Sequence, residues 1–296
     1  MKNLLIATTA LVATAGFAAA DVTLSGAARF GIVHNDANAT GETEVHNRMT
    51  ININGSVETD TGVEFFGYMR VRGGNQGNGA NTALSNTLIG APRVGAKIGG
   101  LTVAVGNING AIDSTAGVYS GSVGLTGLGY SNVVVGGFDG YSSQGAGRNG
   151  VEVIYSMNGL GMHLSHTGNV AGDRTALALT YAFGDWKVAL GHQSADLAAE
   201  EFTMVRVDGS IGNVTVGAAF ASNDVTVGDK IRINAGFKVG AGTSIALFVT
   251  DTDLVGADTA YGLGFTHSLG GATLAGGVVE TATGATRADL GVRFNF

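Results

Sequence analysis

The sequence contains no cysteine and a single proline among its 296 residues, whereas glycine occurs 50 times. The lack of cysteine excludes a fold stapled by disulfides. The scarcity of proline excludes collagen and Pro/Gly-rich disordered chains, in which both residues are abundant. Glycine is therefore expected in turns and at close backbone contacts of a chain that is held together by backbone pairing and burial.

Charged residues are also scarce. They make up 13% of the chain, with a formal net charge of −7, whereas roughly a quarter of the residues of a typical soluble domain are charged. A net negative chain does not suit a polyanion, so no nucleic-acid partner is expected. The low charge content indicates that much of the outer surface faces something other than water.

Long apolar runs are absent except at the N-terminus. There a basic residue precedes an apolar stretch from Leu4 to Phe17, which is followed by three alanines. This arrangement predicts a secretory signal peptide over residues 1–20. A membrane-spanning helix is less suitable, because it needs about 20 apolar residues and this stretch is shorter. Residues 21–296 are then the mature domain.

The mature chain alternates between apolar and polar residues with a period of two. In the first segment Val22, Leu24, Phe30 and Ile32 oppose Thr23, Ser25 and Arg29, and in the last Leu290, Val292, Phe294 and Phe296 oppose Arg287, Asp289 and Arg293. Strand side chains point alternately to opposite faces, so each such segment is predicted to be a β-strand with one apolar face. Sixteen strands are expected, over residues 22–32, 48–54, 63–72, 88–98, 101–107, 149–157, 160–167, 174–183, 186–193, 202–211, 214–221, 230–239, 243–250, 259–269, 272–280 and 287–296.

The connections between these strands alternate between two classes. Seven are tight and rich in glycine or asparagine, as in hairpin turns, and eight are longer and polar, the longest being 108–148. This count fits sixteen antiparallel strands with both chain ends on the tight-turn side. A strand-like stretch from Asn132 to Phe138 leaves eighteen strands as an alternative.

The polar faces carry arginine, lysine and asparagine, whereas the apolar faces carry few charges. An apolar outside and a polar inside is the arrangement of a transmembrane β-barrel, since only a closed barrel leaves no strand edge in lipid. Aromatic residues near the tight-turn ends agree with an interfacial girdle. They are Tyr155, Tyr181, Phe183, Trp186, Phe237, Phe294 and Phe296. The predicted fold is an all-β, 16-stranded antiparallel transmembrane barrel.

Four arginines lie on the polar faces of the first three strands and are expected to converge inside the barrel. They are Arg29, Arg48, Arg70 and Arg72. Either they only hydrate the lumen, or they form a positive wall with water and the carboxylates of Glu64, Asp113 and Asp139 nearby. Arg293, counted from the tight-turn end of its strand, is expected to lie lower in the wall.

Other motifs give little support for chemistry. Residues 145–150 spell a dinucleotide-binding pattern, but a loop precedes them and a strand follows, where the motif needs a strand and then a helix. His163 and His166 are three apart on a predicted strand and so face opposite sides, which disfavours a zinc site. No catalytic residue, metal or cofactor is expected. A barrel enzyme of the protease or lipase type and a surface receptor or adhesin stay as alternatives.

The whole mature chain resembles the general non-specific porins of Gram-negative bacteria, most closely those of alphaproteobacteria. The resemblance rests on residues 22–31 (VTLSGAARFG), 95–106, the glycine-rich segment 108–148 and the ending 288–296 (ADLGVRFNF). It implies an outer-membrane channel for passive diffusion of small hydrophilic solutes and ions, a homotrimer in contact with outer-membrane lipids, and a third loop folded inward as the constriction. The segment 108–148 departs from the family in offering only Asp113 and Asp139 as carboxylates, which puts the usual cation preference in doubt.

The outward faces of the first five strands include small residues, Gly26, Ala28 and Ala96. Small side chains let a second wall approach closely. The sequence therefore predicts that these strands form the trimer contact, with the loop at 73–87 reaching toward a neighbour.

Overall fold

A computed structural model describes residues 20–39, 41–74, 87–128, 135–143, 149–168, 172–223 and 228–296. The described strands are β1 (Asp21–Asn35), β2 (Thr43–Glu58), β3 (Glu64–Gly74), β4 (Leu88–Ile89), β5 (Arg93–Ile98), β6 (Leu101–Asn107), β7 (Asn149–Met157), β8 (Leu160–Thr167), β9 (Arg174–Phe183), β10 (Trp186–Ala195), β11 (Phe202–Ile211), β12 (Val214–Ser222), β13 (Lys230–Gly240), β14 (Thr243–Thr252), β15 (Ala260–Ser268), β16 (Thr273–Glu280) and β17 (Thr286–Asn295). A short 3-10 helix, η2 (Ala198–Glu200), lies between β10 and β11. No helix among the described residues is long and apolar enough to span a membrane.

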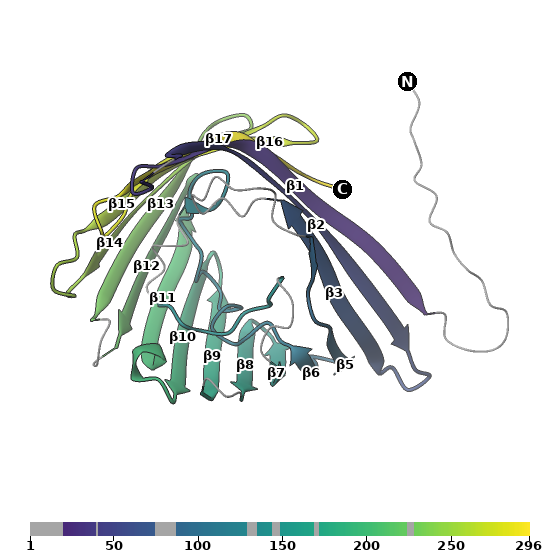
Figure 1. The fold of residues 1–296 in the computed structure, drawn as a ribbon. Coiled ribbons are helices and arrows are strands. Elements are labelled where there is room, and N and C mark those ends of the chain that lie inside the picture. The colour runs from purple at the N-terminus through teal and green to yellow at the C-terminus, as the bar shows by residue number, and fades with distance from the viewer. Residues whose placement is uncertain are drawn as a thin grey trace, which may run out of the picture.

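The strands form one closed antiparallel sheet, in which β1 pairs with both β2 and β17 (Figure 1). β4 and β5 both pair with β3, so they are two pieces of a single wall strand, interrupted where Pro92 cannot donate a backbone hydrogen bond. The described wall therefore has sixteen strands, which confirms the predicted barrel. No further strand is present between β6 and β7 in the described residues; Asn132 to Val134 lie outside them.

The alternation predicted from the sequence is present in the wall. On β1, Leu24 is 69% exposed and Phe30 is 56% exposed on the outer face, although both are apolar. The tight turns use the backbone conformations that glycine and asparagine favour, as at Asn158 (φ 50°) and Gly159 (φ 83°) between β7 and β8. Outward apolar side chains thus cover the barrel's exterior.

The barrel closes through the last residue of the chain. The backbone N–H and C=O groups of Phe296 are hydrogen-bonded to Gly26 of β1, over N···O distances of 3.0 and 2.6 Å. A Cβ atom on residue 26 would lie 2.4 Å from the ring of Phe296, so any larger residue here would have to displace that ring. The small size of Gly26 therefore serves the closure of its own chain and is not evidence for a subunit contact.

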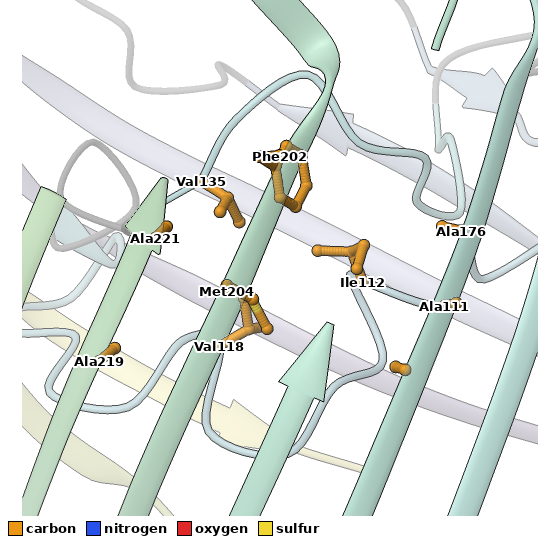
Figure 2. Close-up of a cluster of buried hydrophobic side chains, with 10 residues drawn as sticks. Ala111, Ile112, Val118, Val135, Ala176, Phe202, Met204, Ala219 and Ala221 are labelled. Atoms are coloured by element: carbon orange, nitrogen blue, oxygen red, sulfur yellow. The ribbon is translucent and has the colours of Figure 1, made fainter. Parts of the chain in front are cut away.

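The segment after β6 folds into the barrel and packs against the inner wall (Figure 1). We call its described parts, residues 108–128 and 135–143, the third loop. Its apolar side chains form a buried cluster with inward residues of β9, β11 and β12 (Figure 2). The cluster contains Ala111, Ile112, Val118 and Val135 from the loop and Ala176, Ala178, Phe202, Met204, Ala219 and Ala221 from the wall.

The inner face of the barrel is therefore not polar throughout. Where β9, β11 and β12 share the buried cluster with the third loop, their inward residues are alanine, methionine and phenylalanine, because the loop rather than water is their neighbour. Two predictions lie mostly or wholly outside the described residues. They are the signal peptide, of which only Ala20 is described, and the reach of the loop at 73–87.

Candidate functional site

Three arginines from neighbouring strands lie in one cross-strand row. Arg29 of β1 is paired in register with Arg48 of β2 on one side and with Arg293 of β17 on the other. The Nε of Arg29 donates to Nε2 of the buried His46 over 2.8 Å, and its Nη1 lies 3.3 Å from the carbonyl oxygens of Leu125 and Thr126 in the third loop. Arg29 thus links the wall to the loop.

This arginine row lines a cavity of about 320 Å³ between the wall and the third loop. Tyr119, Ser122 and Thr126 line the loop side, and no carboxylate is among the described residues that line it. The cavity is therefore positive on the wall side and lined by hydroxyl groups on the loop side.

Arg293 lies level with Arg29, so the expectation that it lies lower in the wall was wrong. Counting residues from each strand's own turn ignores the stagger between neighbouring strands that a closed barrel requires. The actual register pairs Arg29 with Arg293 and Ala27 with Asn295, the second-last residue of the chain.

Arg70 and Arg72 of β3 lie next to the row. Arg72 Nε donates to Thr50 Oγ1 over 3.1 Å, and Arg70 Nη2 donates to the carbonyl oxygen of Tyr141 over 2.7 Å. The Arg70 guanidinium also lies over the Tyr141 ring, 4.5 Å from its centroid. Arg70 is therefore a second link from the wall to the third loop.

A second cavity of about 520 Å³ carries charges of both signs. Glu64, Arg70, Lys97 and Tyr68 are among its lining residues. Lys97 Nζ lies 3.0 Å from Glu64 Oε1, and both side chains are partly exposed. Glu64 is thus close to the predicted arginines but is partly neutralised by a lysine that the prediction did not include.

The two loop carboxylates have different surroundings. The Tyr119 hydroxyl donates to Asp113. Burial raises the pKa of this carboxyl above the ordinary value, while the hydrogen bond from Tyr119 and the charge of Arg70 act in the opposite direction. Tyr119 also lines the cavity of the arginine row, so this hydrogen bond places Asp113 one side chain away from that cavity.

Asp139 is placed elsewhere. It is buried, and its carboxylate accepts hydrogen bonds from Thr167 of β8 and from Nη1 of Arg174 of β9, the latter over 2.8 Å. Arg174 also binds Glu200. Asp139 therefore fastens the third loop to the covered wall, and these contacts do not bring it to the arginine row.

Asp289 of β17 holds the middle of the third loop and was not singled out from the sequence. Its carboxylate accepts the backbone N–H groups of Leu125 and Thr126 over 2.8 and 2.7 Å and the Thr126 hydroxyl over 2.7 Å. Gly124 adopts φ 83° just before this contact. In the sequence Asp289 is only one more polar residue on an inward face, so alternation alone gives no hint of its partner.

The histidine pair faces two sides, as predicted. His163 is buried and hydrogen-bonded to Glu152, whereas His166 is exposed and hydrogen-bonded to Thr175. Within the described ranges, no group of three or more His, Cys, Asp or Glu side chains could hold a metal ion. Of residues 145–150, only Asn149 and Gly150 are described, and they begin β7.

Comparison with known proteins agrees with this geometry. A family model described as Gram-negative porin matches residues 7–286. A protein named porin from Fuscovulum blasticum is 31% identical over 304 residues, covering 93% of this chain and 100% of that protein. Solved structures of mutants of the porin from Rhodopseudomonas blastica are 27% identical, with a TM-score of 0.83 over 93% of this chain and 100% of theirs.

Proposed function

The chain belongs to the family of Gram-negative porins and forms an outer-membrane channel, and from this premise we propose that solutes pass between the third loop and the wall of β1–β5. The observation that carries the proposal is the row of Arg29, Arg48 and Arg293, which lines a cavity without a carboxylate among its described lining residues. Arg70, Arg72, Glu64 and Asp113 extend this constriction toward β3 and the loop. Small hydrophilic solutes and ions diffuse through it passively.

Selectivity follows from the balance of charge across this gap. Arginine keeps its charge at any physiological pH, so the wall is permanently positive. Ions in transit respond mainly to charges within about 8 to 10 Å at physiological salt, which lets the local wall outweigh the net negative charge of the chain. Because Glu64 and Asp113 offset part of this field, the preference for anions is weak.

The zero-current potential in a salt gradient tests this proposal. A purified channel in a planar bilayer is expected to give a small potential of the sign that indicates anion preference. Strong cation selectivity would show that the arginines do not line the narrow part of the pore. The single-channel conductance measured in the same bilayer gives the effective width of the opening.

We also propose that the protein is a homotrimer packed through β1–β5. Outward residues of the first two strands are largely exposed in the single chain, with Val22 at 71%, Leu24 at 69% and Val45 at 70%. Ala28 and Ala96 add short side chains on the same outer surface, which would let a neighbouring wall approach. Mass determination in mild detergent is expected to give three chains per particle, and a monodisperse monomer that conducts as one pore would contradict it.

Residues 1–20 are removed during export, so N-terminal sequencing of the outer-membrane protein is expected to begin at Asp21.

The family is one of channels rather than enzymes, and no reaction is proposed. Protease or lipase activity of the purified protein above that of an empty-membrane control would favour the barrel-enzyme alternative. Specific adhesion of cells that display the protein would favour the receptor or adhesin alternative.

A further inference from the structure

Two histidines lie on the outer face of β8 and β10, beside the longer loops. His166 Nδ1 lies 2.9 Å from Thr175 Oγ1 of β9, and His192 Nδ1 lies 2.9 Å from Thr203 Oγ1 of β11. Each pair is directly in register across its two strands, and all four side chains are exposed. The same arrangement therefore occurs twice on one outer surface of the barrel.

The threonine fixes each imidazole ring and leaves its other nitrogen pointing away from the pair. Nδ1 is occupied by the hydroxyl, and Nε2 has no protein partner among the described residues. If the hydroxyl donates to Nδ1, Nε2 carries the proton and donates; if Nδ1 donates, Nε2 accepts. In either tautomer the ring offers one oriented hydrogen-bonding atom to whatever lies outside the barrel.

Serines extend both pairs into a continuous patch. Ser194 is in register with Thr175, and Ser222 is in register with Thr203. We call these six residues of β8–β12 the rim patch: His166, Thr175, Ser194, His192, Thr203 and Ser222. They contribute hydroxyl and imidazole groups and no permanent charge.

The rim patch lies at the edge of the lipid-facing band. Apolar residues exposed by 37 to 47% occupy the next outward positions toward the membrane midplane. They are Leu164, Leu177, Leu190, Val205 and Phe220. The longer loops of such barrels are extracellular, so the patch is at the height where acyl chains end and headgroups of the outer leaflet begin. The tight-turn rim instead carries exposed aromatic residues such as Tyr181 and Phe183.

Charges near the patch are negative. Asp173, Asp196 and Glu201 are exposed on the adjoining loops. Asp173 lies close to His166, because both side chains are next to Gly168. A Cβ atom added to Gly168 would be 3.0 Å from Asp173 Oδ1 and 3.9 Å from His166 Nε2. Such carboxylates repel a bare phosphate but not an uncharged headgroup rich in hydroxyls.

We propose that the rim patch binds the saccharide headgroup of a glycolipid of the outer leaflet, through both Nε2 atoms and the neighbouring hydroxyls.

A lipid-retention experiment tests this proposal on the intact barrel. The protein is placed in nanodiscs with digalactosyl diacylglycerol, phosphatidylglycerol or phosphatidylcholine of the same acyl chains, without divalent cations, and retained lipids are counted by native mass spectrometry. The parent is expected to hold the galactolipid about tenfold more tightly than phosphatidylcholine, as two or three added hydrogen bonds would give. The His166→Leu/His192→Leu variant is expected to lose this preference.

His267 provides a matched control at the opposite rim. Its Nδ1 lies 2.8 Å from Thr243 Oγ1 in the same kind of cross-strand pair, but its other register neighbour is the apolar Leu274, so it has no extended polar patch. His267→Leu is expected to leave galactolipid retention unchanged. His34 and Thr43, which form a similar pair at 2.9 Å, are left intact because they lie on the proposed trimer surface.

Three outcomes would overturn the proposal: equal loss in the control and the double variant, unchanged retention in the double variant, or phosphatidylglycerol held as tightly as the galactolipid. If the double variant does not assemble, Thr175→Val/Thr203→Val is tested in its place. It keeps both imidazole rings but removes the hydroxyl that fixes each ring. That variant is expected to reduce the preference about threefold. The conductance of every rim variant should equal that of the parent, so failure here is distinct from failure of the proposed constriction.

Discussion

The inner faces of two parts of the barrel follow the same alternation but have different neighbours. On β1–β3 the inward side chains that border the two cavities are mostly polar or charged, chiefly arginine, glutamate, tyrosine, threonine, serine and asparagine. On β9–β12 they are mostly small or apolar and lie under the third loop. The inward residue types therefore decide whether a stretch of wall faces water or is covered by the protein's own loop. The two cavities, and with them the proposed solute path, therefore lie on one side of the barrel.

The covered wall is expected to depend most on apolar packing. Met204 is 1% exposed within the cluster shared by the loop and the wall. Met204→Ala is expected to lower the free energy of unfolding by about 2 to 5 kcal/mol, through lost burial and the cavity left behind. Urea unfolding followed by tryptophan fluorescence measures this change.

Val205→Ala is the control for that experiment. Val205 is the next residue of the same strand, but it points outward and is 44% exposed. Its truncation is expected to cost about 1 kcal/mol or less. Equal losses in the two variants would show that packing under the third loop is not the main contribution to stability in this region.

The second prediction concerns the contact between Asp289 and the third loop. It fastens the loop to the open wall, by which we mean β17 and β1–β3, strands that border the two cavities. Asp289→Ala leaves the N–H groups of Leu125 and Thr126 without their carboxylate, at a cost of roughly 1 to 3 kcal/mol. This part of the third loop is expected to loosen, so single-channel records should show more frequent closures and greater current noise.

Asp251→Ala is the matched control because Asp251 is exposed at the loop end of β14 and accepts only the Thr259 hydroxyl among its described contacts. Its records should match those of the parent. Quiet records from the Asp289 variant would mean that Arg29 and the apolar cluster hold the loop without Asp289.

The third prediction concerns the permanent charge of the open wall. Arg48→Ala combined with Arg70→Ala is expected to move the zero-current potential toward cation preference and to increase conductance. One unit charge at about 8 Å in water contributes about 0.5 kcal/mol, or roughly a twofold change in permeability for each arginine removed. Reversal potentials in a salt gradient give the ratio.

Arg293→Ala sharpens this test, because the register places Arg293 beside Arg29. Its effect is expected to equal that of Arg48→Ala alone. Lys187→Ala, at the tight-turn end of β10, removes the same charge outside the two cavities and should have less effect. A response that is the same for all three positions would assign selectivity to net charge rather than to the arginine row.

The sequence predicted the features that depend on local alternation. Most strand ends were correct within two residues, and Arg29, Arg48, Arg70 and Arg72 were correctly placed on inward faces. The level of Arg293 could not be predicted in the same way, because it depends on the stagger between strands far apart in the chain. The partners of Asp139 and Asp289 depend on where the third loop crosses the barrel, and neither residue belongs to a motif that indicates this path.

The smallest expected effect concerns Asp113 of the third loop, whose carboxyl accepts the hydroxyl of Tyr119, a residue that lines the cavity of the arginine row. Since burial raises its pKa, Asp113 takes up a proton at a higher pH than an ordinary aspartate as the solution is acidified. The gap then loses one negative charge while its arginines keep theirs, so anion preference should increase as the solution is acidified from neutral pH, by roughly twofold at most. Asp113→Asn should show the increased anion preference already at neutral pH, and it should lose this part of the pH response. Glu64→Gln, which alters the carboxylate paired with Lys97, should retain it. If the reversal potential of the Asp113 variant follows pH as the parent does, another group produces the change, and the third loop adds no titratable charge to the constriction.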